Sequence, residues 1–229
     1  MAYYDNPSYI PLLQSAYRNW KQLEKKANKK FLIENGILEI AFATAIKTKI
    51  NFLKKYHIPF ELLNSKEMSI QFPDFFLPKD MMGLFQPQGG FLYIDQCIQF
   101  FIDESIALGA QIFSQEKVKT WNIETNGKVL VKTDKDIYQS KYLIFTSSAW
   151  TNELLPELNL NLEILQKKLV WSSACSNYYS IKKNSPCFAY HLGHDLFYGF
   201  PNINGFIKVS RHTGGSIFPS SKMMKKKLL

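Results

Sequence analysis

The sequence lacks several features that would place it quickly in a class of proteins. It has no run of about 18 apolar residues, so it offers no candidate for a membrane-spanning helix. The first residues, MAYYDNPSY, contain neither the basic nor the apolar segment of a secretory signal. The three cysteines, Cys97, Cys175 and Cys187, form no C-x-x-C pair and no metal-ligand spacing with the four histidines. We therefore expect a cytoplasmic protein with reduced, buried thiols, no metal site and no membrane partner.

Arginine is also scarce, with Arg18 and Arg211 as the only two, although the formal net charge is +9. Surfaces that bind nucleic acid usually combine arginine with aromatic residues or carry a known motif, and neither is present. The lysines instead predict solvated faces, with no nucleic acid partner. A basic binding protein is the alternative from a different functional class, and the charge is also compatible with anionic substrates.

Hydrophobic residues make up 46% of the sequence and aromatic residues 15%, which predicts an ordered globular chain. The pattern of helices and strands along it predicts a mixed α/β fold. Apolar spacing predicts helices over residues 8–28 and 44–56, a short helix capped by Ser65, and a helix over 96–108 capped by Asp95 and closed by Gly109. Pro73, Pro78, Pro87 and Gly89-Gly90 predict a loop-rich passage between them. Alternating patterns predict strands over residues 37–42, 111–113, 118–125, 128–133, 142–146, 165–173, 188–191, 195–200 and 206–211, with Asn126-Gly127 as a hairpin turn.

The segment YGFPNINGFIKVSRH, from Tyr198 to His212, carries the most chemical information. Its first strand ends at G-F-P, residues 202–205 supply turn chemistry, and a second strand carries Lys208. Because side chains alternate along a strand, Lys208, Ser210 and His212 share one face. At roughly 3.3 Å per residue, Lys208 and His212 are about 13 Å apart, a separation that suits two groups on either side of a planar ligand.

This segment resembles the monomeric sarcosine oxidase and N-methyltryptophan oxidase family, flavoenzymes related to D-amino-acid oxidase, which share YGFP followed by G-x-x-K-x-x-x-H. Five further segments resemble the family in the same order along the chain. They are YYDNPSYIPLLQSAYRNWKQLE, NGILEIAF, LLNSKEMSIQFPDFFLP, FQPQGGFLYIDQCIQFFIDESIALGAQI and KYLIFTSSAWTNELLPELNL.

The resemblance implies an FAD-dependent oxidase of N-methyl or secondary amino acids, which oxidises a C–N bond to an imine and reduces O₂ to H₂O₂. It implies that Lys208 activates O₂ over the flavin, that His212 contacts the substrate and that the Tyr198 hydroxyl faces the substrate cavity. It also implies an interleaved domain order: residues 1–85 and 156–218 in a substrate domain with a mostly antiparallel sheet, and 86–155 in the FAD domain. Residues 219–229 form a Lys-rich tail that resembles nothing in the family. The FAD contacts implied are Val118, Ser148, Ala149 and Trp150.

The sequence also departs from the family. It has no G-x-G-x-x-G turn, its first glycine is Gly36, and Gly89-Gly90 is not followed directly by a helix, so it predicts a tight turn and not a phosphate site. Ser148 replaces a family glycine, and Gln166 replaces the usual arginine. The family cysteine that bonds FAD would lie beyond residue 229. These departures predict a middle fragment that binds FAD weakly, and they keep open an inactive fragment or one that needs the missing pieces as separate chains.

Two further groups of residues are expected to be structural. His191 and His194 flank a glycine in a predicted turn. Trp150 and Trp171 are expected to be packing residues.

Overall fold

The computed structural model describes residues 8–173 and 177–218, so Cys175 and the predicted tail at 219–229 lie outside the described residues. The chain divides into two compact units. Unit 1 contains residues 1–102 and 167–214, and unit 2 contains 103–166 and 215–229. The boundaries between these units, at 102/103 and 166/167, differ from the predicted domain boundaries at 85/86 and 155/156. The assignment of chain segments to substrate and FAD binding stays a prediction.

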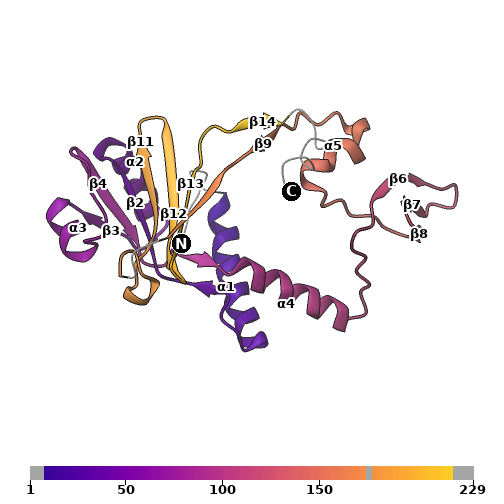
Figure 1. Ribbon diagram of the computed structural model, residues 1–229, viewed down its shortest axis with the longest axis horizontal. Coiled ribbons are helices and arrows are strands. Elements are labelled where there is room, and N and C mark those ends of the chain that lie inside the picture. The colour runs from indigo at the N-terminus through magenta and orange to yellow at the C-terminus, as the bar shows by residue number, and fades with distance from the viewer. Residues whose placement is uncertain (1–7, 174–176, 219–229) are drawn as a thin grey trace. The chain divides into compact units, whose positions relative to one another are not determined.

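Unit 1 is built on a seven-stranded sheet in the order β10-β13-β12-β11-β2-β4-β3 (Figure 1). Neighbouring strands are antiparallel except for β11 and β2, which run parallel. The predicted mixed α/β class is confirmed. The strands are β2 (Ile37–Phe42), β3 (Glu61–Leu63), β4 (Met81–Gln86), β10 (Leu169–Ser173), β11 (Cys187–Leu192), β12 (Asp195–Ile203) and β13 (Phe206–Arg211).

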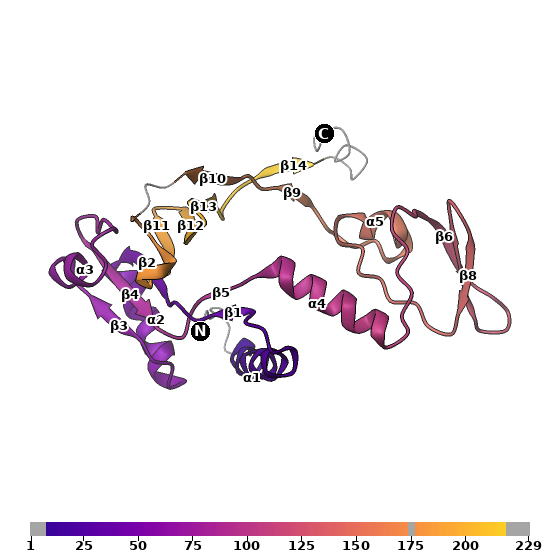
Figure 2. The same cartoon turned by 60° about the horizontal axis from the view of Figure 1, so that its bottom comes forward.

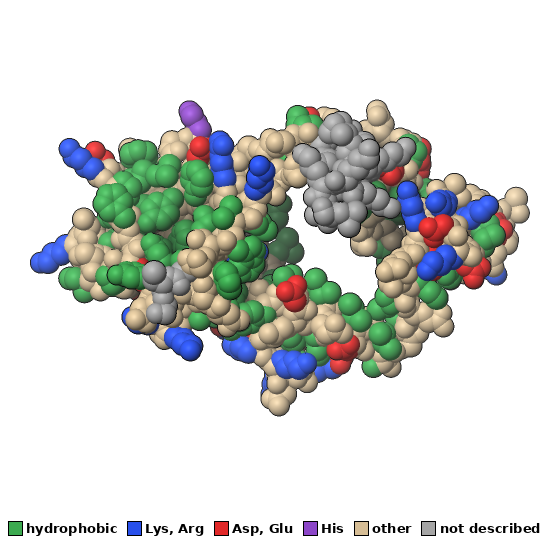
Figure 3. Space-filling view, viewed as in Figure 1, with side chains coloured by type: hydrophobic (Ala, Val, Ile, Leu, Met, Phe, Trp, Pro, Cys, Tyr) green, Lys and Arg blue, Asp and Glu red, His purple; other side chains and the backbone are tan. Residues whose placement is uncertain are grey.

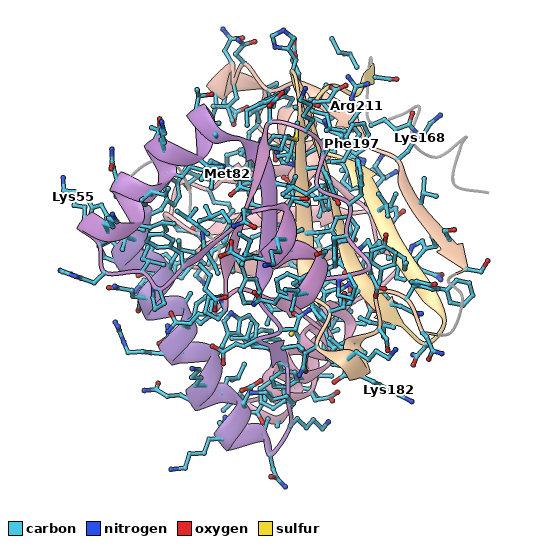
Figure 4. The ribbon with its side chains drawn as sticks, turned by 90° about the vertical axis from the view of Figure 1, so that its left-hand side faces the viewer. Lys55, Met82, Lys168, Lys182, Phe197 and Arg211 are labelled. Atoms are coloured by element: carbon cyan, nitrogen blue, oxygen red, sulfur yellow. The ribbon has the colours of Figure 1, made fainter. Side chains whose placement is uncertain are left out.

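Helices cover the two faces of this sheet at its β2-β4-β3 end. On one face, α2 (Ala43–Lys55) packs Ile46 and Leu53 against Ala41 and Leu84 of the strands. Met82 of β4 lies against the same cluster (Figure 4). On the other face, α3 (Ser65–Gln71) and the segment after it pack against Leu38, Ile40 and Leu63, through Met68, Phe72 and Phe75. These side chains, buried except for the half-buried Met82, form the core of unit 1.

A second, two-stranded sheet pairs β1 (Leu32–Ile33) with β5 (Phe91–Leu92), between α1 (Tyr9–Ala27) and α4 (Ile94–Ala107). The chain enters β5 through Gly89 and Gly90, where Gly36 N–H donates to the Gly89 carbonyl. A Cβ on Gly90 would lie 1.8 Å from the Ile33 carbonyl oxygen, so only glycine fits there. The predicted tight turn is confirmed, and these glycines serve backbone packing.

Unit 2 contains a three-stranded antiparallel sheet, visible in Figure 2, made of β6 (Val118–Ile123), β7 (Val129–Thr133) and β8 (Ile137–Ser140). The predicted turn at Asn126-Gly127 is confirmed, with Gly127 at φ +77°. Shorter elements complete the unit: η1 (Ser148–Trp150), α5 (Thr151–Leu154), η2 (Pro156–Leu158), and a second sheet that pairs β9 (Ile164–Gln166) with β14 (Ser216–Phe218). The strands of residues 118–140 and those of 169–211 therefore lie in different sheets, and β9 belongs to a third.

Several predicted elements differ from those in the structure. Residues 111–113 and 142–146 form no strand, and the predicted strand 165–173 is divided into β9 and β10. The stretch interpreted as loop-rich contains β4, whose Gly83 and Leu84 are both buried, so the strand shows no alternation of polar and apolar residues. The cap of α3 is Asn64 and not Ser65. Its side chain accepts from Lys66 N–H and Glu67 N–H, while Glu67 accepts from Asn64 N–H.

Asp95 is not a cap either, because α4 begins one residue before it and places it in the first turn. No helix in residues 8–173 and 177–218 is both long and apolar enough to cross a membrane. Within the same residues, no group of three or more metal-ligating side chains is gathered. Cys97 and Cys187 are free and buried, as predicted, and burial raises the pKa of the Cys187 thiol to about 12.

Candidate functional site in unit 1

The hairpin β12–β13 forms where the sequence predicted it. Asn204 and Gly205 both have positive φ, at +55° and +88°, and the Asn202 side chain accepts from Gly205 N–H. The first strand is longer than predicted, because β12 continues through Pro201 to Ile203 with a bulge. Gly199 is required by packing, since a Cβ there would lie 2.2 Å from the Phe188 ring.

The register of β10, β13 and β12 places the predicted site residues on one face of the sheet. Lys208 lies opposite Trp171 on one side and Phe200 on the other, and Tyr198 lies opposite Ser210. Directly opposed residues share a face, so these side chains lie together. We call this surface the Lys208 face. Figure 3, which labels no residue of this face, shows that hydrophobic side chains gather on the visible side of unit 1, with Lys and Arg side chains at the margin.

The Lys208 ammonium lies between two aromatic rings. Its Nζ is 5.5 Å from the Trp171 ring centroid and 5.3 Å from that of Phe200, within range of cation–π attraction. The Lys208 side chain is half-buried, whereas Trp171 is 60% exposed. Trp171 and Trp150, which were expected to be packing residues, both lie at the surface, and Trp171 packs against Lys208 there. The rings restrict where the Lys208 charge can lie and leave this part of the face accessible.

His212 follows β13 directly, and its imidazole meets the Tyr198 ring edge to face. The two ring centroids are 6.0 Å apart with an interplanar angle of 72°. The His212 N–H donates to the Leu196 carbonyl, which extends the β12–β13 ladder by one bond. Tyr198, Lys208 and His212 thus share the Lys208 face, with His212 exposed and the other two half-buried.

A charged cluster lies on the same face, two strands away from Tyr198. Glu39 of β2 accepts from His191 Nε2 of β11 at 2.5 Å and from the Lys49 ammonium of α2. Burial would raise the pKa of Glu39, but the hydrogen bonds and charges of His191 and Lys49 outweigh it and hold that pKa below its ordinary value of 4.5. His191 lies in β11, as the predicted strand over residues 188–191 has it, and the predicted turn forms around Gly193.

The predicted FAD contacts belong to unit 2. Val118 begins β6, and Ser148, Ala149 and Trp150 make up η1. The Trp121 Nε1–H donates to the Leu154 carbonyl at 2.7 Å and ties β6 to α5. A hollow of about 460 Å³ lies beside this contact, lined by Trp121, Lys119, Glu153 and Glu157 among others, and it contains none of the predicted FAD contacts.

Ser148 has φ +47°, in the left-handed region that favours glycine. We expect Ser148→Gly to raise the free energy of unfolding by about 0.5 kcal/mol, because relief of backbone strain exceeds the added chain entropy. Ser147→Gly is the matched control. Ser147 has φ −83° and its Oγ lies 3.1 Å from Thr151 Oγ1, so this change should cost about 1 kcal/mol. Denaturant unfolding measures both, and a loss of stability in Ser148→Gly equal to that of the control would contradict the expected strain.

The structure also shows residues that sequence reasoning missed. The rings of Trp171 and Phe200 flank the Lys208 ammonium. The Glu39 carboxylate contacts both Lys49 and His191. Next to His212, the Thr213 hydroxyl donates to Asp195. The alternating pattern predicted Asp195 and Phe200 as residues of one strand. No local signal in the sequence predicts that Trp171 pairs with Lys208. That pairing depends on the strand order of the whole sheet.

The residues present fit one part of a bound FAD and not another. A half-buried ammonium among aromatic rings on an accessible sheet face suits a planar, electron-accepting ring. The pyrophosphate needs a glycine turn at a helix N-terminus. Within the described residues, Gly89-Gly90 is used by backbone packing, and Gly214-Gly215 precedes the strand β14. Neither pair provides that turn.

Comparison with known proteins identifies the family. Residues 1–220 match the DAO family, described as FAD dependent oxidoreductase. Monomeric sarcosine oxidase of Bacillus sp. (strain B-0618) is 26% identical over 223 residues, which cover 93% of this chain and 56% of that protein. Peroxisomal sarcosine oxidase of Homo sapiens is 29% identical, with 93% and 56% covered. N-methyl-L-tryptophan oxidase of Yersinia pestis (strain Pestoides F) is 26% identical, with 98% and 60% covered.

Solved structures share the fold. The open form of NikD, an amino acid oxidase essential for nikkomycin biosynthesis, superposes with a TM-score of 0.75 at 19% identity, covering 95% of this chain and 58% of that one. L-proline dehydrogenase from P. horikoshii gives 0.72 at 16% identity, with 97% and 61% covered. The chain spans 56–60% of the length of these three sequence relatives.

Proposed function

Because this chain belongs to the DAO family of FAD-dependent oxidoreductases, we propose that it forms the substrate side of an oxidase of N-methyl or secondary amino acids. The observation that carries the proposal is the joint placement of Tyr198, Lys208 and His212 on the Lys208 face. FAD, when bound, supplies the oxidation of the substrate C–N bond to an imine and the reduction of O₂ to H₂O₂. We place the protein in the cytoplasm.

Each of the three residues has a role that follows from its chemistry. The Lys208 ammonium, held between Trp171 and Phe200, provides a fixed positive charge where negative charge develops as O₂ is reduced. The His212 imidazole can accept or donate a hydrogen bond through its ring nitrogens, and so can orient the substrate amine. The Tyr198 hydroxyl can donate to or accept from the substrate at the edge of the site.

The unit 2 residues Val118, Ser148, Ala149 and Trp150 are proposed as FAD contacts. Ser148 weakens this part of the site, because it adds a Cβ and a hydroxyl at a left-handed position. The second candidate function, a fragment without FAD binding or activity of its own, is favoured by Ser148 and by the missing glycine turn. Activity would then depend on further polypeptide, supplied as separate chains.

The test uses the chain with FAD in large excess, because we expect weak binding. Calorimetric titration should give a dissociation constant weaker than micromolar. Under anaerobic conditions, sarcosine or N-methyl-L-tryptophan should then bleach the visible flavin absorption, and air should restore it. In Lys208→Met, the flavin absorption should bleach at the normal rate and recover more slowly in air, since the ammonium acts on O₂.

The outcomes separate the candidates. Bound FAD that no secondary amino acid bleaches would overturn the oxidase proposal. No FAD binding at any concentration would favour the inactive fragment. Equal slowing of bleaching and recovery in Lys208→Met would contradict the role given to Lys208.

A further inference from the structure

His212 lies one residue beyond the end of β13. The register between β12 and β13 ends with Arg211 opposite Phe197, and both residues are visible at this end of the hairpin in Figure 4. Beyond that pair, the His212 N–H makes one more backbone bond, to the Leu196 carbonyl at 2.7 Å. An exposed residue just past a strand end usually frays, so further contacts are needed to fix the imidazole.

The two neighbours of His212 are both anchored to one carboxylate. Arg211 donates from Nε and Nη2 to Asp195 Oδ1 at 2.9 and 2.6 Å, and Thr213 Oγ1 donates to the same oxygen at 2.9 Å. The Thr213 hydroxyl in turn accepts from Leu196 N–H at 3.3 Å. Asp195 therefore connects the start of β12 to both sides of His212.

This arrangement determines which way the imidazole points. Along a strand, neighbouring side chains point to opposite faces. Arg211, the last residue of β13, bonds Asp195 on the face opposite Lys208, and Thr213, at the bend that follows, bonds the same carboxylate. His212 between them points to the Lys208 face, where it meets the Tyr198 ring. From the other direction, the Lys167 ammonium donates to the His212 carbonyl at 2.6 Å and to the Gly214 carbonyl.

We propose that Asp195 and Thr213 are positioning residues that hold the His212 imidazole against Tyr198 on the Lys208 face. The inference rests on the proposed function for the importance of His212, but the contacts themselves are properties of the chain alone. The Thr213 and Arg211 hydrogen bonds also hold the pKa of Asp195 below its ordinary value, which agrees with a carboxylate that remains ionised while it accepts them.

The test measures the His212 ring in the FAD-free chain by NMR, with His212→Gln used to assign its signals. Edge-to-face packing on Tyr198 should displace the His212 ring proton signals, and Tyr198→Leu should remove that displacement. Thr213→Val keeps the side-chain size and loses the hydroxyl, so it should lose more than half of the displacement. Thr213→Ser keeps the hydroxyl and should retain it, and Asp195→Ala, which removes the acceptor, should behave like Thr213→Val.

The Lys208 side-chain signals, displaced by the Trp171 and Phe200 rings, report on general loss of structure. They should be unchanged in every variant of Asp195 and Thr213. Retention of the full His212 displacement in Thr213→Val and Asp195→Ala would overturn the proposal, and so would equal loss of the Lys208 displacement. Since neither FAD nor substrate is used, failure of the oxidase proposal would leave these results as they are.

Discussion

Replacing Gly90 by alanine should lower the free energy of unfolding by about 3 kcal/mol, at the upper end of the usual cost of overpacking. The added Cβ would lie 1.8 Å from the Ile33 carbonyl oxygen and 2.8 Å from its carbon. These are backbone atoms of β1, which pairs with β5 directly after Gly90, so they cannot turn aside as a side chain could. Denaturant unfolding of the purified chain, followed by tryptophan fluorescence, measures the change.

Gly193→Ala is the matched control for Gly90→Ala. Gly193 lies in the same unit with φ +64°, and a Cβ there would meet no atom within 4 Å. Its alanine variant should lose only about 1 kcal/mol, the cost of a left-handed alanine. Equal losses in the two variants would show that the contact with Ile33 is relieved by movement of the chain, and would remove the structural reason for the glycine pair.

Replacing Glu39 by glutamine should cost about 1–3 kcal/mol at neutral pH, the usual worth of hydrogen bonds to a buried charge. Glu39 has only 13% of its side chain exposed and is bonded to both Lys49 and His191, so the change removes the buried charge that both groups contact. Glu61→Gln is the control on the same sheet. Its exposed carboxylate accepts from Gln71 Nε2 at 3.0 Å, and its loss should cost less than about 1 kcal/mol.

The difference in unfolding free energy between the wild type and Glu39→Gln should depend on pH. The folded pKa of Glu39 is below 4.5, so the carboxylate stabilises the fold fully above about pH 4.5 and loses that effect as the pH falls through its folded pKa. The unfolding free energies of the wild type and Glu39→Gln should therefore converge in acid. A difference that stays constant from neutral pH to pH 3 would show that packing, and not charge, explains the loss.

Elements with local signals were predictable from the sequence. The apolar spacing of α1, the strand after Gly36 and the hairpin turn at residues 202–205 were confirmed at nearly the predicted positions. The alternation from Phe206 to Arg211 also placed Lys208 and His212 on one face before any pairing was known. These features depend on side-chain periodicity and turn chemistry, which act between residues close in sequence.

Other features depended on contacts between distant segments. β4 was missed because a strand buried on both faces shows no alternation, and the cap of α3 was misassigned by one residue. Nothing near Trp171 in the sequence indicates that its ring would lie beside Lys208, since β10 is paired to β13 only by the register of the sheet. The Asp195 contacts around His212 likewise require the two strands to be folded together.

The sequence by itself therefore determined the family resemblance, the α/β class and the identity of the candidate site residues Tyr198, Lys208 and His212. Only the tertiary structure decided what surrounds them: the rings of Trp171 and Phe200 around the Lys208 ammonium, and the Asp195 carboxylate beside His212. The physical reason is that strand periodicity and turns are properties of a few neighbouring residues. Cross-strand neighbours are chosen by the packing and register of the complete sheet, which no local segment specifies.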